Sequence, residues 1–181
     1  MRYLIILLLI TTTVVGQSSE DVFFTRSGEI LFKSDAPLEL ITASSSEVRG
    51  VIDIKKNTFA FSVPVKSFEG FNSPLQKEHF NENYMESDKY PAATFNGKII
   101  EDIDYSQDGS YTVRAKGILL VHGVDQERII KGDINVKNGV IHITSSFIVL
   151  LEEHNIKVPK IVFQKISPEI QVEINAQLVR K

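Results

Sequence analysis

The side chains able to bind a metal or act as nucleophiles are few in this chain and lie far apart. The four histidines, which show neither the H-x-H nor the H-E-x-x-H spacing of a metal site, are His79, His122, His142 and His154. The chain has no cysteine, which excludes thiol catalysis, cysteine metal sites and disulfides. No G-x-S-x-G, G-x-G-x-x-G or P-loop pattern occurs. We therefore expect no catalytic residue, no metal and no cofactor.

Paired carboxylates, which could do general acid–base work, occur at Glu101-Asp102 and Glu152-Glu153. Both pairs fall where strands are expected to end, and charged turns are the ordinary explanation for them. An enzyme that uses scattered residues inside a barrel stays open as a third hypothesis, and it predicts ionisable groups that point inward.

Alternation of apolar and polar residues dominates the chain after Gln17 and indicates antiparallel strands with one buried and one wet face. In the clearest run, every even-numbered residue from Ile170 to Leu178 is apolar. Turn signals, of which Asn138-Gly139 is the strongest, separate about eight or nine runs. Residues 38–43 and 48–55 count as separate strands here. Because such a sheet needs closure or a second layer, the pattern predicts an all-β closed barrel.

One segment interrupts the alternation and begins like a helix. Ser73 suits the N-cap, Pro74 suits the first helical position, and Gln76 stands where a capping-box partner belongs. We expect a single short helix over about residues 74–84, lying near one mouth of the barrel.

Length and charge restrict the class of protein further. The 181 residues suit one domain, and the net charge of −3 gives no electrostatic case for nucleic acid or an anionic membrane, since both need clustered Lys and Arg. Residues 1–16 combine Arg2, an apolar run and small residues, which predicts a secretory signal peptide rather than a membrane span. We expect a single domain over residues 17–181 that is periplasmic or secreted, without a stable membrane anchor.

Several motifs in order resemble the YceI-like family of exported lipid-binding proteins, also called polyisoprenoid-binding proteins. The first is Glu78-His79-Phe80 followed by Lys89-Tyr90-Pro91-Ala92-Ala93-Thr94-Phe95, the second is Gly117 to Val124, and the third is His154 to Pro159 followed by Ile170 to Ile174. The resemblance covers roughly residues 30–179. It implies an eight-stranded, lipocalin-like antiparallel barrel that holds a long apolar molecule, such as an isoprenoid chain or a fatty-acid derivative, and it implies no catalytic residues.

A barrel of eight strands is either just filled by its side chains or just able to hold one small ligand. The expected ligand-binding residues, on the apolar strand faces and in the insert, are Phe59, Phe61, Val63, Phe68, Phe71, Leu75, Phe80, Phe95, Leu119, Ile141, Ile143, Phe147 and Val149, with Val172 and Ile174 beside them. Candidates for contacting a polar head group are Lys77, His79, Asn83 and Arg114. A filled barrel that serves as a stress-related or protein-interaction module is the alternative, and a homodimer stays open.

Overall fold

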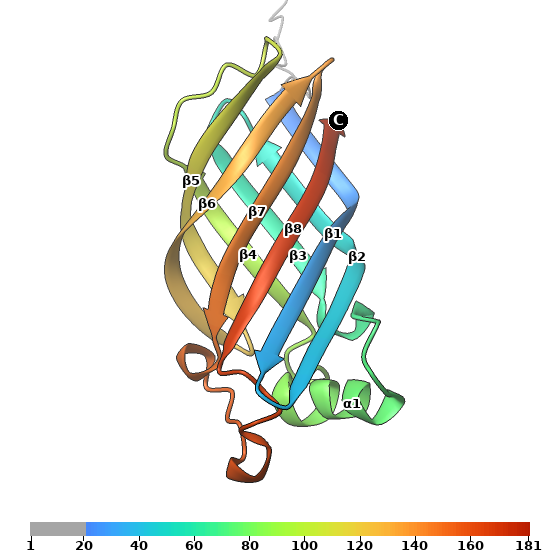
Figure 1. Ribbon diagram of the computed structural model, residues 1–181. Coiled ribbons are helices and arrows are strands. Elements are labelled where there is room, and N and C mark those ends of the chain that lie inside the picture. Colours follow the sequence, from blue (N-terminus) through green and yellow to red (C-terminus); the bar gives the residue numbers. More distant parts are fainter. Residues whose placement is uncertain (1–20) are drawn as a thin grey trace, which may run out of the picture.

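The computed structural model describes residues 21–181, which form a closed barrel of eight antiparallel strands in sequence order (Figure 1). The strands are β1 (Val22–Ala36), β2 (Glu39–Asp53), β3 (Thr58–Pro64), β4 (Ala92–Ile99), β5 (Gly109–Val121), β6 (Val124–Lys137), β7 (Val140–Leu150) and β8 (Glu169–Arg180). The expected all-β barrel is confirmed. The expected signal peptide over residues 1–16 lies outside the described residues, so it and the domain boundary at residue 17 stay predictions.

The insert between β3 and β4 contains the one α-helix of the described chain, α1 (Pro74–His79), which runs directly into a π-helical turn, Phe80–Tyr84. The Ser73 hydroxyl accepts a hydrogen bond from the Gln76 amide at 3.2 Å, as an N-cap does. The expected helix over 74–84 is therefore confirmed. We call the barrel end beside α1 the helix end and the opposite end the far end (Figure 1). No helix within residues 21–181 has the length and apolarity needed to cross a membrane.

The reading of residues 38–43 and 48–55 as separate strands is wrong, because both belong to β2. The inward-facing residues are odd-numbered up to Ser45 and even-numbered from Val48 onward. A register shift opposite Gly28 of β1 marks the irregularity between them. A β-bulge inserts one residue and reverses the parity of the pattern, so one long strand looks like two short ones in the sequence.

Side chains of the barrel fill the far half of the interior. The buried cluster there comes from all eight strands and from the β4–β5 connection: Phe23, Ile52, Phe59, Ile99, Tyr105, Val113, Ile134, Val136, Ile141, Ala176 and Leu178. Tyr105 reaches this cluster from the connection, and its ring centroid lies 6.5 Å from that of Phe23. Burial raises the pKa of Tyr105 to about 12. Open space inside the barrel lies at the waist and toward the helix end.

Candidate ligand-binding cavity

A cavity of about 480 Å³ occupies the helix end of the barrel. Its wall consists of inward-facing residues such as Leu119, Phe147 and Val172, and its roof consists of residues from the insert and from the segment between β7 and β8. The exposed residues Leu75 and Lys165 also line it, so the cavity reaches the surface between these two segments. The volume falls within the range that holds small-molecule ligands.

A second cavity of about 130 Å³ continues the first toward the waist of the barrel. The residues that line both cavities, and so mark their junction, are Ile30, Val63, Ala93, Leu119 and Phe147. Phe59, Phe61 and Phe95 line the smaller cavity on the far side, and the rings of Phe59 and Phe95 lie 4.9 Å apart. Ile52, Ile99, Val113 and Ile134 of the packed cluster also line the smaller cavity, so the rings and this cluster together form its floor.

Four phenylalanines form an aromatic cluster at the mouth of the larger cavity. Phe32 of β1 stacks on Phe80 of the insert, with ring centroids 5.3 Å apart and planes 18° apart. Phe68 and Phe71 pack against the same pair, with centroids 5.4 Å and 5.9 Å from Phe32. Since three of the four rings belong to the insert, this packing holds the insert over the mouth and provides an apolar surface there.

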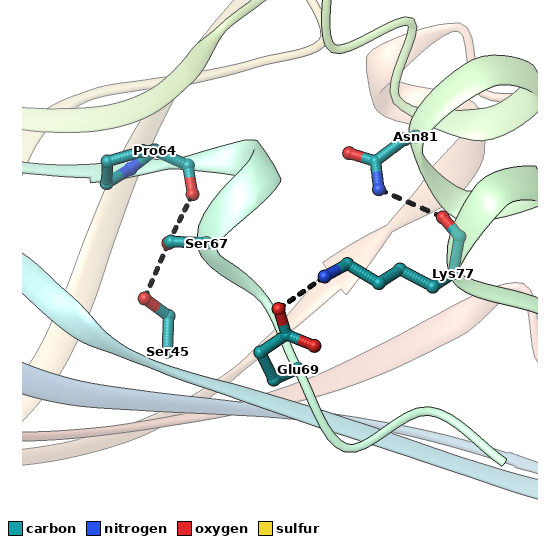
Figure 2. Close-up of polar contacts among 6 residues, drawn as sticks. All are labelled: Ser45, Pro64, Ser67, Glu69, Lys77 and Asn81. Atoms are coloured by element: carbon teal, nitrogen blue, oxygen red, sulfur yellow. Dashed lines mark hydrogen bonds and ion pairs between the residues drawn. The ribbon is translucent and has the colours of Figure 1, made fainter. Parts of the chain in front are cut away.

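Polar contacts fasten the insert to β2 (Figure 2). The Ser67 hydroxyl donates to the Pro64 carbonyl at 2.6 Å and lies 2.6 Å from the Ser45 hydroxyl. Ser44 and Glu69 exchange both backbone hydrogen bonds at 2.8 Å. The Lys77 ammonium pairs with the Glu69 carboxylate, which links α1 to this fastened segment (Figure 2). The insert is therefore held at its base by β2.

A few polar groups line the mouth of the larger cavity. The Glu39 carboxylate accepts a hydrogen bond from the Gln76 side-chain amide at 3.0 Å, which joins the start of β2 to α1. His79 and Lys165 line the same mouth. Burial raises the pKa of Tyr84, another lining residue, so its hydroxyl stays protonated and able to donate. Such a rim can orient the polar end of an amphipathic molecule whose tail lies inside.

The turn between β5 and β6 and the 3₁₀ turn Leu151–His154 contact each other beside the larger cavity, which Val121 and Leu151 line. His122 Nδ1 lies 3.0 Å from the His154 carbonyl oxygen, and its Nε2 lies 2.8 Å from a carboxylate oxygen of Glu86. His154 is fully buried, and its Nε2 has no hydrogen-bond partner. Burial lowers the pKa of His154. Two histidines that sequence alone leaves unrelated therefore meet at one structural junction.

The structure brings the expected ligand-binding residues together, with one exception. Those that line the larger cavity, the smaller cavity or both are Phe59, Phe61, Val63, Phe68, Phe71, Leu75, Phe80, Phe95, Leu119, Ile143, Phe147 and Val149. Ile141 lines neither, because it lies in the packed cluster of the far half. Among the head-group candidates His79 lines the mouth, whereas Arg114 pairs with Glu101 at 2.7 Å and Lys77 with Glu69. Asn83 is exposed and lines neither cavity.

Several lining residues escape the sequence reasoning. They are Phe32 of β1, Glu39 at the start of β2, Tyr84 and Met85 of the insert, and Ile156, Val162, Lys165 and Ile166 before β8. Phe32 shares the parity of Ile30, so the alternation could have shown it. The segment before β8 has no period, and only the closed barrel brings it to the mouth.

A wider hollow of about 830 Å³ lies at the waist against the wall formed by β1, β2 and β5–β8. Many of its lining residues are exposed and polar, among them Glu29, Asp133 and Glu173. Such a lining suits an apolar tail poorly, so the helix-end cavity remains the candidate site. Within residues 21–181, no three His, Asp or Glu side chains lie close enough together to hold a metal ion.

Comparison with known proteins agrees with this architecture. The model of the YceI-like domain matches residues 23–178. This chain belongs to the YceI-like family. No curated protein sequence matches it.

Solved structures share the fold of this YceI-like protein. A polyisoprenoid-binding domain from Saccharophagus degradans, implicated in plant cell wall breakdown, is 11% identical, with a TM-score of 0.73 over 89% of this chain and 99% of that one. BcnA of Burkholderia cenocepacia is 13% identical, with a TM-score of 0.67 over 84% of this chain and 96% of that one. The YceI protein of Campylobacter jejuni is 14% identical, with a TM-score of 0.54 over 97% of this chain and 90% of that one. At these identities the likeness shows the fold alone.

Proposed function

We propose that this protein binds the apolar tail of a lipid-like molecule, of isoprenoid or fatty-acid type, in the helix-end cavity. The observation that carries the proposal is the 480 Å³ space lined by Leu119, Phe147, Val172 and the aromatic cluster, open at one mouth. Burial of apolar surface stabilises a complex by roughly 25 cal/mol per Å², so enclosure of a tail needs no charge pair. The polyisoprenoid-binding domain of Saccharophagus degradans has the same fold, which supports this class of ligand.

The cavity volumes set the length of tail that fits. At about 30 Å³ per non-hydrogen atom, the larger cavity holds roughly 16 atoms and the smaller one about four more. We therefore assign a tail of about 16 to 20 carbons to the interior, and a longer chain would leave its remainder outside. The polar head group would contact Glu39, His79 and Lys165 at the mouth.

The proposed role is that of an exported carrier rather than an enzyme. The expected signal peptide supports export, and the polar groups at the mouth form hydrogen bonds suited to orientation, such as that between Glu39 and Gln76. A filled barrel that acts only through other proteins is the competing hypothesis. It is disfavoured by the cavity, because close-packed interiors rarely leave voids much larger than a water molecule.

A cavity-blocking variant tests the proposal. Ala93 faces the junction of the two cavities, so Ala93→Phe places a ring where the tail should lie. Ala60→Phe makes the same change on the exposed outer face of β3 and serves as the control. We expect palmitate and geranylgeraniol to bind the parent protein and Ala60→Phe, and to bind Ala93→Phe at least tenfold more weakly. Equal binding to all three, or no binding to any and no apolar compound in denaturing extracts, would refute the proposal.

A further inference from the structure

The segment between the 3₁₀ turn Leu151–His154 and β8, residues 156–168, is here called the mouth loop. It contains Lys157, Lys160 and Lys165 and no acidic residue. Between these lysines Ile161 is 91% exposed and Phe163 is 62% exposed. The net charge of −3 of the whole chain conceals this local basic cluster. Large apolar side chains so exposed beside lysines mark a surface that contacts something else.

The mouth loop has a defined conformation with internally paired backbone. The Val162 amide donates to the Pro159 carbonyl at 3.0 Å, and the Lys165 amide donates to the Val162 carbonyl at 2.8 Å. At its base the Leu38 amide donates to the Gln164 carbonyl at 2.9 Å, and the Ser167 amide donates to the Ser34 hydroxyl at 2.9 Å. Figure 1 shows the loop, in red-orange, at the helix end, where it extends further beyond the barrel than any other part of the molecule. Paired backbone groups reduce the cost of entering an apolar phase.

The exposed apolar surface continues from the mouth loop around the cavity mouth. Leu38, whose amide is hydrogen-bonded to the loop, is exposed, and so are Leu40 two residues further on and Leu75 of α1. The Asn72 side chain donates to the Leu40 carbonyl at 3.0 Å, which joins the start of β2 to the insert. Val162 and Lys165 of the loop also line the cavity. The apolar surface and the cavity entrance are therefore one continuous region.

We propose that the mouth loop docks the protein reversibly on an anionic lipid bilayer, with the cavity mouth against the membrane. Apolar tips flanked by lysines are the signature of a segment that enters the headgroup region, where the apolar side chains insert and the lysines contact anionic lipid. A protein partner would have to supply both a deep apolar pocket and acidic groups, whereas an anionic bilayer supplies both everywhere on its surface. If the proposed ligand is correct, its tail then passes between bilayer and cavity without crossing water.

Vesicle flotation tests the docking. The probes are vesicles of phosphatidylcholine alone and of phosphatidylcholine with about one quarter phosphatidylglycerol, at low and high salt. We expect the parent protein to bind the anionic vesicles, and to bind them less at high salt. The double variant Ile161→Ser/Phe163→Ser should lose at least about 100-fold in partitioning, since burying each side chain contributes about tenfold or more. Lys157→Gln/Lys160→Gln should lose about tenfold or more, and only with anionic vesicles.

Matched controls separate the loop from general stickiness. Ile129→Ser/Ile148→Ser removes two exposed isoleucines from the barrel wall, and Lys98→Gln/Lys137→Gln removes two exposed lysines toward the far end. Both controls should bind like the parent protein. No binding by the parent, equal binding to neutral vesicles at all salt concentrations, or a concentration-dependent dimer abolished by the loop variants would overturn the proposal. Because the loop variants keep the inner wall of the cavity, palmitate binding measured without vesicles tests the proposed ligand separately.

Discussion

The ring of Phe61 packs directly against Gly50 of β2. Replacing Gly50 therefore tests whether this ring forms part of the floor of the cavity. A Cβ at this position would lie 2.1 Å from Cε1 and 2.2 Å from Cδ1 of Phe61. Such a contact forces the ring to move, and the smaller cavity that Phe61 lines offers the space. We therefore expect Gly50→Ala to push the ring into the smaller cavity while the barrel stays folded.

The cavity volume gives the size of the effect. The smaller cavity of about 130 Å³ accommodates roughly four carbons of a tail at about 30 Å³ each. At about 0.8 kcal/mol per buried methylene, loss of these contacts weakens binding of the longest tail by about 3 kcal/mol, or more than 100-fold. Tails of up to about 16 carbons should bind Gly50→Ala as they bind the parent protein, because they end in the larger cavity.

Displacement of a fluorescent fatty acid by saturated acids of about 10 to about 20 carbons measures this dependence. The parent protein should gain about fourfold in affinity per methylene until the interior is full, and then no more. Gly50→Ala should reach its plateau about four carbons earlier. Gly109→Ala is the control, because its Cβ would instead meet Tyr111, which lines neither cavity. An equal loss at every length, or an unchanged plateau, would refute the assignment of Phe61 to the floor.

Three further predictions concern stability. The free energy of unfolding, measured in urea, should be highest above pH 6.5 and should fall as the pH drops through the lowered pKa of buried His154. The control variant His142→Ala, which removes an exposed histidine, should show the same dependence on pH. A free energy of unfolding that stays constant down to about pH 5 would contradict this prediction. Tyr105→Phe should raise the unfolding free energy by about 1 kcal/mol, because the buried Tyr105 hydroxyl has no partner; a loss in urea denaturation would argue that it is satisfied. Phe61→Asp should unfold the barrel or abolish ligand binding, because it places an unpaired charge inside the barrel. Glu173→Ala on the exposed face should change the free energy of unfolding by less than about 0.5 kcal/mol. Similar melting curves for the two variants, measured by circular dichroism, would disprove the register of β3 and β8.

The sequence predicts the barrel and its helix because local rules and tertiary packing agree there. The alternation of β8 and the Ser73 cap both appear in the structure as expected. The bulge in β2 could not be predicted, because a parity change looks the same as a break between strands.

The division of the interior could not be predicted either. Ile141 and Phe147 belong to the same face of β7, and yet Ile141 lies in the packed half and Phe147 in the open half. What separates them is the β4–β5 connection, which places Tyr105 in the far half, and the insert, which lies across the mouth instead of inside. Alternation reports which side of the wall a residue faces and carries no information about how full the interior is.

The role of residues 156–168 was hidden for a related reason. This segment has neither strand nor helix periodicity, so pattern reasoning passes over it as a connection. Only closure of the barrel brings Val162 and Lys165 to the cavity mouth and leaves Ile161 and Phe163 outside.

A crystal structure of the protein grown with palmitate tests the central claim most directly. We predict continuous tubular density between Leu119, Phe147 and Val172, ending at the aromatic floor, with the carboxylate at the mouth beside Lys165. Side chains of the protein itself filling the helix-end space, or density for the fatty acid only on the outer wall, would contradict the account.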